Sequence, residues 1–175
     1  MMRQGCRAWA AVVVAQALGL SPGGSVHADT GINGCTIVSN PTSVNHTNCP
    51  NANLQGVHLA HVDLSYAYLT NATLTDVYQD YIGNLQGANL SHATLVNTRL
   101  TAVDLQGALL QGTLLQGANL TRGNLTGANL SGATLQGARL LYVVWQNTIC
   151  PDGTNSNADG GTCVNNLQVP GGPRP

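Results

Sequence analysis

The sequence predicts an all-β protein whose central part is a solenoid of square coils. Two observations lead to this prediction. Leucine recurs at every fifth position over most of the chain, and a small residue stands two positions before each of these leucines. A period of five fits neither an amphipathic helix, in which apolar residues recur about every 3.6 positions, nor a strand, in which side chains alternate between two faces.

The leucines form two blocks that are separated by one irregular stretch. They stand at Leu54, Leu59, Leu64, Leu69 and Leu74, and then at Leu85, Leu90, Leu95, Leu100, Leu105, Leu110, Leu115, Leu120, Leu125, Leu130, Leu135 and Leu140. Val143 and Trp145 extend the same register, with Trp in the place of Leu. The interval between the blocks is one residue too long for the repeat, so we expect residues 77–82 to hold a bulge or a short loop.

A five-residue repeat with two inward positions turns the chain by about a quarter of a circuit. Four repeats then close one square coil of about 20 residues, and successive coils stack at the strand spacing of about 4.8 Å. The narrow interior has room for one large and one small residue on each side, which accounts for Leu and for Ala, Val, Thr or Gly. Residues 52–147 hold enough repeats for about five coils.

The residue just before Leu is often Asn or Asp, as in Ala88-Asn89-Leu90, Ala118-Asn119-Leu120 and Ala128-Asn129-Leu130. This A-(N/D)-L-x-x pattern resembles the pentapeptide-repeat family over residues 52–147. The resemblance implies a right-handed quadrilateral β-helix. A leucine-rich repeat is excluded, because its units need about 20 to 29 residues with a different internal pattern.

The first 28 residues have the features of a secretory signal peptide. Two arginines and no acid precede an apolar run from Ala8 to Leu20, and Val26-His27-Ala28 offers small residues for cleavage before Asp29. The apolar run is shorter than the roughly 20 residues that a membrane-spanning helix needs. We therefore expect a secreted or periplasmic protein, with cleavage after Ala28 and no membrane span in the mature chain.

The cysteines of the mature chain flank the repeats. Cys35 and Cys49 precede the first repeat, and Cys150 and Cys163 follow the last. A disulfide requires Cα atoms within about 7 Å, so links between opposite ends of the solenoid are excluded. We predict the local pairs Cys35–Cys49 and Cys150–Cys163, which close the two exposed ends of the stack and fit an oxidising compartment.

These features divide the chain into five parts. They are a signal peptide at 1–28, an N-terminal disulfide cap at 29–51, the β-helix at 52–147, a C-terminal disulfide cap at 148–163 and a disordered tail at 164–175. The tail is expected to be disordered because it is short and contains the run Pro170-Gly171-Gly172-Pro173.

Charged residues are too few and too scattered to predict an active site. Only 7% of the residues are charged, and the chain contains no Glu and no Lys. Asp63, Asp76, Asp80 and Asp104 are spread along the repeats, so we expect no pair of carboxyl groups to act as acid and base. With four cysteines in disulfides, we find no constellation of a nucleophile and a histidine. We therefore predict a non-catalytic protein without a cofactor.

Metal binding is the weaker interpretation of two polar segments. Asn155, Asn157 and Asp159 resemble the start of a calcium loop, but the loop lacks the bidentate Glu with which such sites close. A turn held by the second disulfide is favoured. His58 and His61 flank Leu59 and are expected to leave different faces of the coil, so we predict no metal site.

The surface richest in chemistry is a group of tyrosines with an acidic neighbour. The predicted interaction patch consists of Tyr66, Tyr68, Tyr78, Tyr81 and Asp80. Tyrosine rings with polar neighbours can stack on a sugar or anchor a protein contact. We therefore expect the partner to be a protein or glycan of the cell envelope, while shielding of the predicted bulge by the same tyrosines is the structural alternative. The sequence predicts no oligomeric state.

Two other functions are kept as alternatives. Some cytoplasmic members of the resembling family mimic DNA and act on gyrase, which requires a strongly acidic surface. Beyond Ala28 the chain holds four arginines and seven aspartates, which gives a net charge of about −3. This charge is too weak for a DNA mimic, and we expect no nucleic acid as a partner. Ice or surface binding requires regular threonines, whereas the positions after Leu mix Gln86, Gln106 and Thr126.

Overall fold

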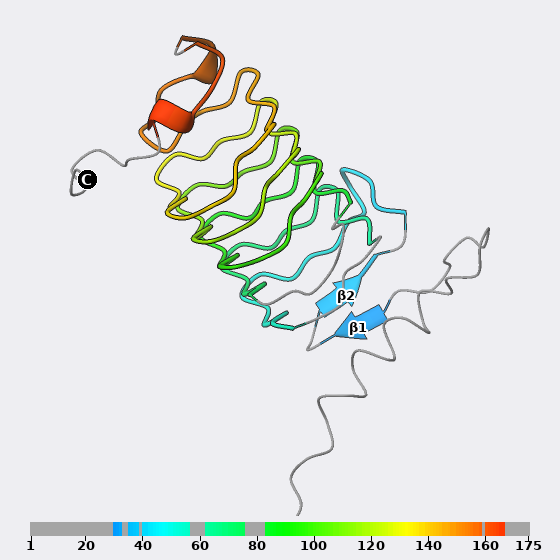
Figure 1. Ribbon diagram of the computed structural model, residues 1–175. Coiled ribbons are helices and arrows are strands. Elements are labelled where there is room, and N and C mark those ends of the chain that lie inside the picture. The colour runs from blue at the N-terminus through cyan, green and yellow to red at the C-terminus, as the bar shows by residue number, and fades with distance from the viewer. Residues whose placement is uncertain are drawn as a thin grey trace, which may run out of the picture.

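The computed structural model of the protein describes residues 30–32, 35–38, 40–56, 62–75, 83–158 and 160–166. The predicted signal peptide, the predicted bulge and the end of the predicted tail lie outside these residues. The described part is a stack of coils (Figure 1), with strands β1 (Thr30–Ile32) and β2 (Cys35–Ile37) at one end. The 3-10 helices η1 (Ser156–Ala158) and η2 (Val164–Asn166) lie at the other end. No helix in these residues is long and apolar enough to span a bilayer.

The stack is a right-handed quadrilateral β-helix, as predicted. Parallel bridges join residues that are one coil apart, as in Asn84↔Asp104 and Asp104↔Asn124. The coil that contains the irregular stretch is one residue longer, because Asp63 pairs with Asn84 and Tyr68 with Asn89. The extra residue is therefore absorbed within a single coil, and the stacking register continues unchanged beyond it.

A β-turn forms each corner of the coil. At one corner the N–H of Ala67 donates to the carbonyl oxygen of Leu64 (3.0 Å), and Tyr66, the third residue of the turn, has a φ of 59°. A positive φ at this position is typical of a type II turn and favours Gly or Asn. Most corners in the described residues carry Gly or Asn, and the exceptions among them are Tyr66, His92, Ala102, Arg122 and Tyr142.

The Asn or Asp before Leu stabilises the following corner. Oδ1 of Asn89 accepts a hydrogen bond from the N–H of Ser91 (3.0 Å), and Asp104 does the same for Gln106 (3.0 Å). The same bond recurs at Asn53, Asp63, Asn84, Asn119, Asn124 and Asn129. Short polar side chains commonly bond the backbone two residues onward and thereby initiate turns. The repeat therefore selects Asn or Asp for the backbone rather than for a ligand.

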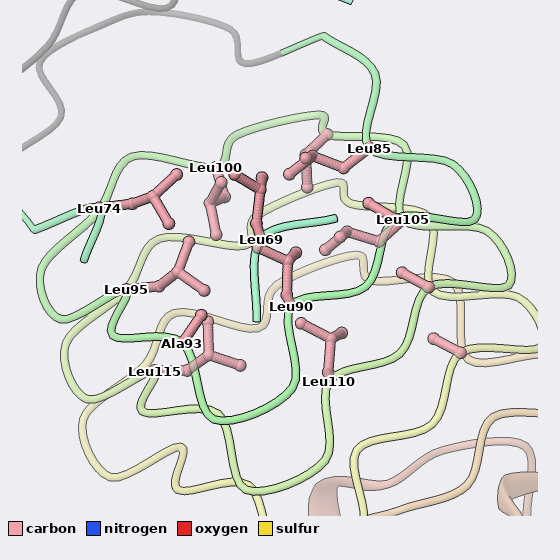
Figure 2. Packing of buried hydrophobic residues seen from close by; sticks show 14 of the residues in the cluster. Leu69, Leu74, Leu85, Leu90, Ala93, Leu95, Leu100, Leu105, Leu110 and Leu115 are labelled. Carbon is pink, nitrogen blue, oxygen red and sulfur yellow. The ribbon is translucent and has the colours of Figure 1, made fainter. Parts of the chain in front are cut away.

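The leucines and small residues fill the interior of the coils. Figure 2 shows leucine side chains that point inward from the sides of successive coils, and Leu90, Leu95 and Leu115 are fully buried. Where Thr replaces Ala inside, its hydroxyl group has a partner: Oγ1 of Thr113 donates to the carbonyl oxygen of Leu90 (2.8 Å). Trp145 is 5% exposed and occupies the Leu position of the last coil, as the register predicts.

Both predicted disulfides are present. Cys35, at the start of β2, is bonded to Cys49 with a Cα–Cα distance of 5.1 Å, and Cys150 is bonded to Cys163 at 5.3 Å. β1 and β2 form an antiparallel hairpin that the sequence did not predict. At the other end η2 lies just after Cys163, in a segment that we expected to belong to the tail. Both disulfides therefore join a cap to an end of the stack.

The C-terminal cap folds back onto the last coil. The N–H of Ser156 donates to the carbonyl oxygen of Thr148 (2.9 Å), and the N–H of Thr148 donates to Oγ of Ser156 (3.0 Å). Ile149 pairs antiparallel with Asn155. These bonds cover the edge of one side of the last coil, which would otherwise expose unpaired backbone groups.

Candidate interaction surfaces

The β-helix presents four faces, each with one outward residue per coil. Face A carries Asn48, Tyr68, Asn89, Leu109, Asn129 and Ile149. Face B carries Asn53, Thr73, Thr94, Leu114 and Thr134. Face C carries Arg99, Asn119 and Arg139, and face D carries Asp63, Asn84, Asp104, Asn124 and Val144. The faces follow one another along the chain in the order A, B, C, D.

Two members of the predicted tyrosine patch lie together near the N-terminal end. Tyr68 is on face A, Tyr66 is at the corner between faces D and A, and their side chains are 44% and 39% exposed. The ring of Tyr66 lies over Gly87 of the next coil. Tyr78, Tyr81 and Asp80 lie outside the described residues, so the structure describes only Tyr66 and Tyr68 of the predicted patch. The pair offers two aromatic surfaces to solvent.

The described carboxylates take part in the folding of the corners. Asp63 accepts a hydrogen bond from the N–H of Ser65 (2.9 Å). Asp104 accepts from the N–H of Gln106 (3.0 Å) and from Nδ2 of Asn124 (3.3 Å). The two carboxylates are on face D, two coils apart, since both pair with Asn84 across the intervening coil. The two carboxylates are therefore separated by Asn84, and each accepts a hydrogen bond from the backbone of its own corner.

The segment that resembles a calcium loop serves as part of the cap. Oδ1 of Asn157 accepts from the N–H of Asn147 (2.9 Å), and Nδ2 of Asn155 donates to Oδ1 of Asn147 (2.9 Å). Asp159 lies outside the described residues. Within the described ranges, no group of three or more His, Cys, Asp or Glu side chains could hold a metal ion.

The histidines of the described part do not come together. His92 is exposed at the corner between faces A and B, where its ring lies over Gly112. His46 is half-buried and precedes the first coil. His58 and His61 lie outside the described residues. The arrangement of His92 over Gly112 repeats that of Tyr66 over Gly87, so a large corner side chain packs on the glycine of the following coil.

Sequence reasoning missed a second exposed group at the C-terminal end. Leu141 and Tyr142, at the corner between faces C and D, are 60% and 70% exposed, and Val144 on face D is 48% exposed. Arg139 on face C precedes them, and Arg122 stands at the same corner one coil earlier. The charge distribution in the sequence could have indicated this group, because Arg122 and Arg139 are the only charged residues between Asp104 and Asp152.

Threonines on the outside of the coils are more regular than we expected from the positions after Leu. The outward position is the residue before Leu. On face B this outward position holds Thr73, Thr94 and Thr134, with Leu114 between the last two. Leu114 is 37% exposed and interrupts the row. After Asn53, the described part of face B is therefore a row of threonines that Leu114 interrupts.

The chain matches the family described as pentapeptide repeats. The family model, which describes the repeat in eight copies, matches residues 43–76, 84–122 and 104–140. Together these segments cover more than half of the sequence. No curated protein matches the chain.

Several solved structures are similar to part of the chain. HetL from the cyanobacterium Nostoc sp., a pentapeptide repeat protein involved in heterocyst differentiation regulation, is 35% identical, with a TM-score of 0.39 and coverage of 66% of this chain and 45% of HetL. A pentapeptide repeat protein of the Arabidopsis thaliana thylakoid lumen is 23% identical, with a TM-score of 0.32 and coverage of 58% and 61%. QnrB1, a plasmid-mediated fluoroquinolone resistance protein, is 17% identical, with a TM-score of 0.30 and coverage of 58% and 66%. The chain therefore spans less than half the length of HetL.

Proposed function

Since this chain belongs to the pentapeptide repeat family, whose members are generally non-enzymatic structural or interaction proteins, we propose that it is a secreted, non-catalytic module that binds a protein or glycan outside the cytoplasm. The observation that carries the proposal is the pair of disulfides that join the caps to the two ends of the β-helix.

The disulfides support the location. Disulfides persist in secreted and periplasmic proteins and are rare in the reducing cytosol. Each link closes a short loop, with sequence separations of 14 and 13, and stabilises the folded chain by about 3 kcal/mol in the chain-entropy model. A cytosolic chain would lose this contribution at both ends. The apolar N-terminal segment with its small residues before Asp29 is the export signal that this location requires.

The surface chemistry supports binding rather than catalysis. The described Asn and Asp side chains before Leu are engaged with backbone N–H groups of their own corners. Exposed aromatic rings are enriched at binding surfaces, because they bury a large apolar area while keeping a hydroxyl group for a hydrogen bond. Tyr66 and Tyr68 provide two such rings within one coil.

A variant that restores the repeat pattern tests the tyrosine pair. One coil later the same two positions hold Gly87 and Asn89, so Tyr66→Gly combined with Tyr68→Asn converts the pair to residues that the fold already accepts there. We expect this variant to fold and to bind a cell-envelope extract more weakly than the unchanged protein. Tyr78→Ala combined with Tyr81→Ala tests the rest of the predicted patch in the same assay.

The matched control is Asn71→Gly combined with Thr73→Asn, which makes the same kind of change at the next corner of the same coil. It is expected to bind as the unchanged protein does. Unchanged binding by the variant at Tyr66 and Tyr68 would exclude this pair as the site. Absence of binding by the unchanged protein to every envelope fraction would contradict the proposed function.

A further inference from the structure

The exposed group at the C-terminal end combines two cations with an aromatic ring. We call Arg122, Arg139, Leu141 and Tyr142 the arginine–tyrosine corner. The backbone holds these residues in place: the N–H of Arg122 donates to the carbonyl oxygen of Leu141 (2.9 Å), and the N–H of Arg139 donates to the carbonyl oxygen of Ala118 (2.8 Å). All four side chains are exposed on adjoining parts of the last two coils.

The charge around this corner is positive. The chain from Leu105 to Pro151 contains no Asp and no Glu, so the arginines have no acidic neighbour within their own coils. The nearest described carboxylate on the adjoining face D is Asp104, which lies one coil before Asn124 and two coils before Val144, and which accepts a hydrogen bond from Nδ2 of Asn124. Because the overall net charge is only −1, a local group of two arginines without acids is a departure from the rest of the molecule.

The backbone at this corner gives an independent reason to expect a role beyond folding. The left-handed corner position is Gly at the neighbouring corners of the same coils, namely Gly107, Gly112, Gly117, Gly127, Gly132 and Gly137. At the arginine–tyrosine corner it is Arg122 with φ 63° and Tyr142 with φ 59°. Large residues rarely adopt a positive φ, and such strained positions are often found at functional sites. Tyr142 is 70% exposed, so its ring is not retained for burial in the core.

We propose that the arginine–tyrosine corner binds an acidic polysaccharide through its carboxylate groups. Guanidinium groups form bidentate hydrogen bonds with carboxylates, and an exposed tyrosine ring can stack on the apolar face of a sugar. The proposal deepens the proposed function, and rests on it, because it names the chemistry of the partner outside the cytoplasm.

The number of cations favours a polysaccharide over a nucleic acid. Duplex DNA carries about one charge per 1.7 Å, and proteins that bind it commonly make about 6 to 10 phosphate contacts. The arginine–tyrosine corner offers two guanidinium groups beside apolar side chains. This low charge density fits a chain with one carboxylate per sugar unit, whose sugar rings also offer surfaces to Tyr142 and Leu141.

Binding of the purified, oxidised full chain to immobilised polygalacturonate tests the proposal. Three variants restore the repeat pattern at the corner: Arg122→Gly, Arg139→Asn and Tyr142→Gly. Gly is the usual residue at the corner position, and Asn119 occupies the position of Arg139 one coil earlier. We expect the double variant at the two arginines to weaken binding at least roughly tenfold, and Tyr142→Gly to weaken it by roughly three- to tenfold. Gly relieves the strain of a positive φ, so Arg122→Gly and Tyr142→Gly are expected to raise the melting temperature slightly, and Arg139→Asn is expected to leave it unchanged.

Two control variants make the same backbone change elsewhere. His92→Gly and Asn97→Gly replace non-glycine residues at positive φ on other corners, and both are expected to bind polygalacturonate as the unchanged protein does. Neutral dextran is expected not to bind. Failure of the unchanged protein to bind polygalacturonate, or equal binding by the arginine variant, would overturn the proposal. Stronger binding to duplex DNA or to poly-aspartate of matched charge would also overturn it. The assay uses purified protein, so a negative result leaves the proposed export of the chain untouched.

Discussion

The ring of Tyr66 lies directly on the backbone of Gly87, one coil further along the β-helix. A Cβ atom added to Gly87 would lie 2.9 Å from Cδ1 and 3.1 Å from Cε1 of that ring. Gly87 also has a φ of 65°, so its lack of a side chain serves both the corner and the contact with Tyr66. The next glycine of this corner, Gly107, has the same backbone conformation with no atom within 4 Å of an added Cβ.

We expect substitution by Ala to lower the free energy of unfolding by different amounts at Gly87 and Gly107. Gly107→Ala introduces only the strain of a positive φ, and we expect it to lower the free energy of unfolding by about 1 to 2 kcal/mol. Gly87→Ala adds the contact with Tyr66 and is expected to cost about 1 kcal/mol more. Denaturant unfolding of both variants measures the difference. Combining Gly87→Ala with Tyr66→Ala should remove the additional loss of stability that Gly87→Ala shows over Gly107→Ala. If that additional loss persists, the contact with Tyr66 is not its cause.

Adjacent leucines give a direct test of the inward register. Leu110 is 1% exposed inside the coil, whereas Leu109 is 39% exposed on face A. We expect Leu110→Ala to cost about 2 to 5 kcal/mol, because it leaves a cavity in a packed core. Leu109→Ala should cost well under 1 kcal/mol. Thermal or denaturant unfolding of the two variants checks the prediction, and equal costs would mean that the assignment of inward positions is wrong.

The two disulfides should stabilise the ends of the stack independently. We expect Cys35→Ser with Cys49→Ser, and separately Cys150→Ser with Cys163→Ser, to lower the free energy of unfolding by about 3 kcal/mol each. The caps lie at opposite ends of the stack, so the two losses should add. Unfolding with and without a reducing agent provides the measurement. No effect of reduction on the unchanged protein would contradict a stabilising role for the caps.

The fold could be predicted from the sequence because every repeat places one large and one small residue inside the coil. Each Leu with its small partner defines one side of a coil, and the register carries through to Trp145, which is buried as expected. The cysteine pairs followed from the length of the stack, since only local links satisfy the distance that a disulfide needs. The extra residue between Leu74 and Leu85 was visible as a break in spacing, and the pairing of Asp63 with Asn84 reflects it.

The candidate surfaces were harder to predict, because they depend on which side chains share a corner. Arg122 and Tyr142 are one coil apart and lie at one corner, but the repeat pattern does not predict that the side chains at this corner are exposed. The repeat pattern also does not reveal that Asn89 and Asp104 are engaged with backbone N–H groups, since an outward polar side chain could equally bind a ligand. The tyrosines were predicted from composition, and only Tyr66 and Tyr68 can be placed in the described residues.

Expression of the full chain in a bacterial host, followed by cell fractionation and mass measurement without reduction, tests the central claim most directly. We predict a protein outside the cytoplasm that begins at Asp29 and has no free thiols. Its peptide masses should contain the links Cys35–Cys49 and Cys150–Cys163. A full-length, reduced protein that is retained in the cytoplasm would contradict the account and would favour the alternative of a DNA mimic that acts on gyrase.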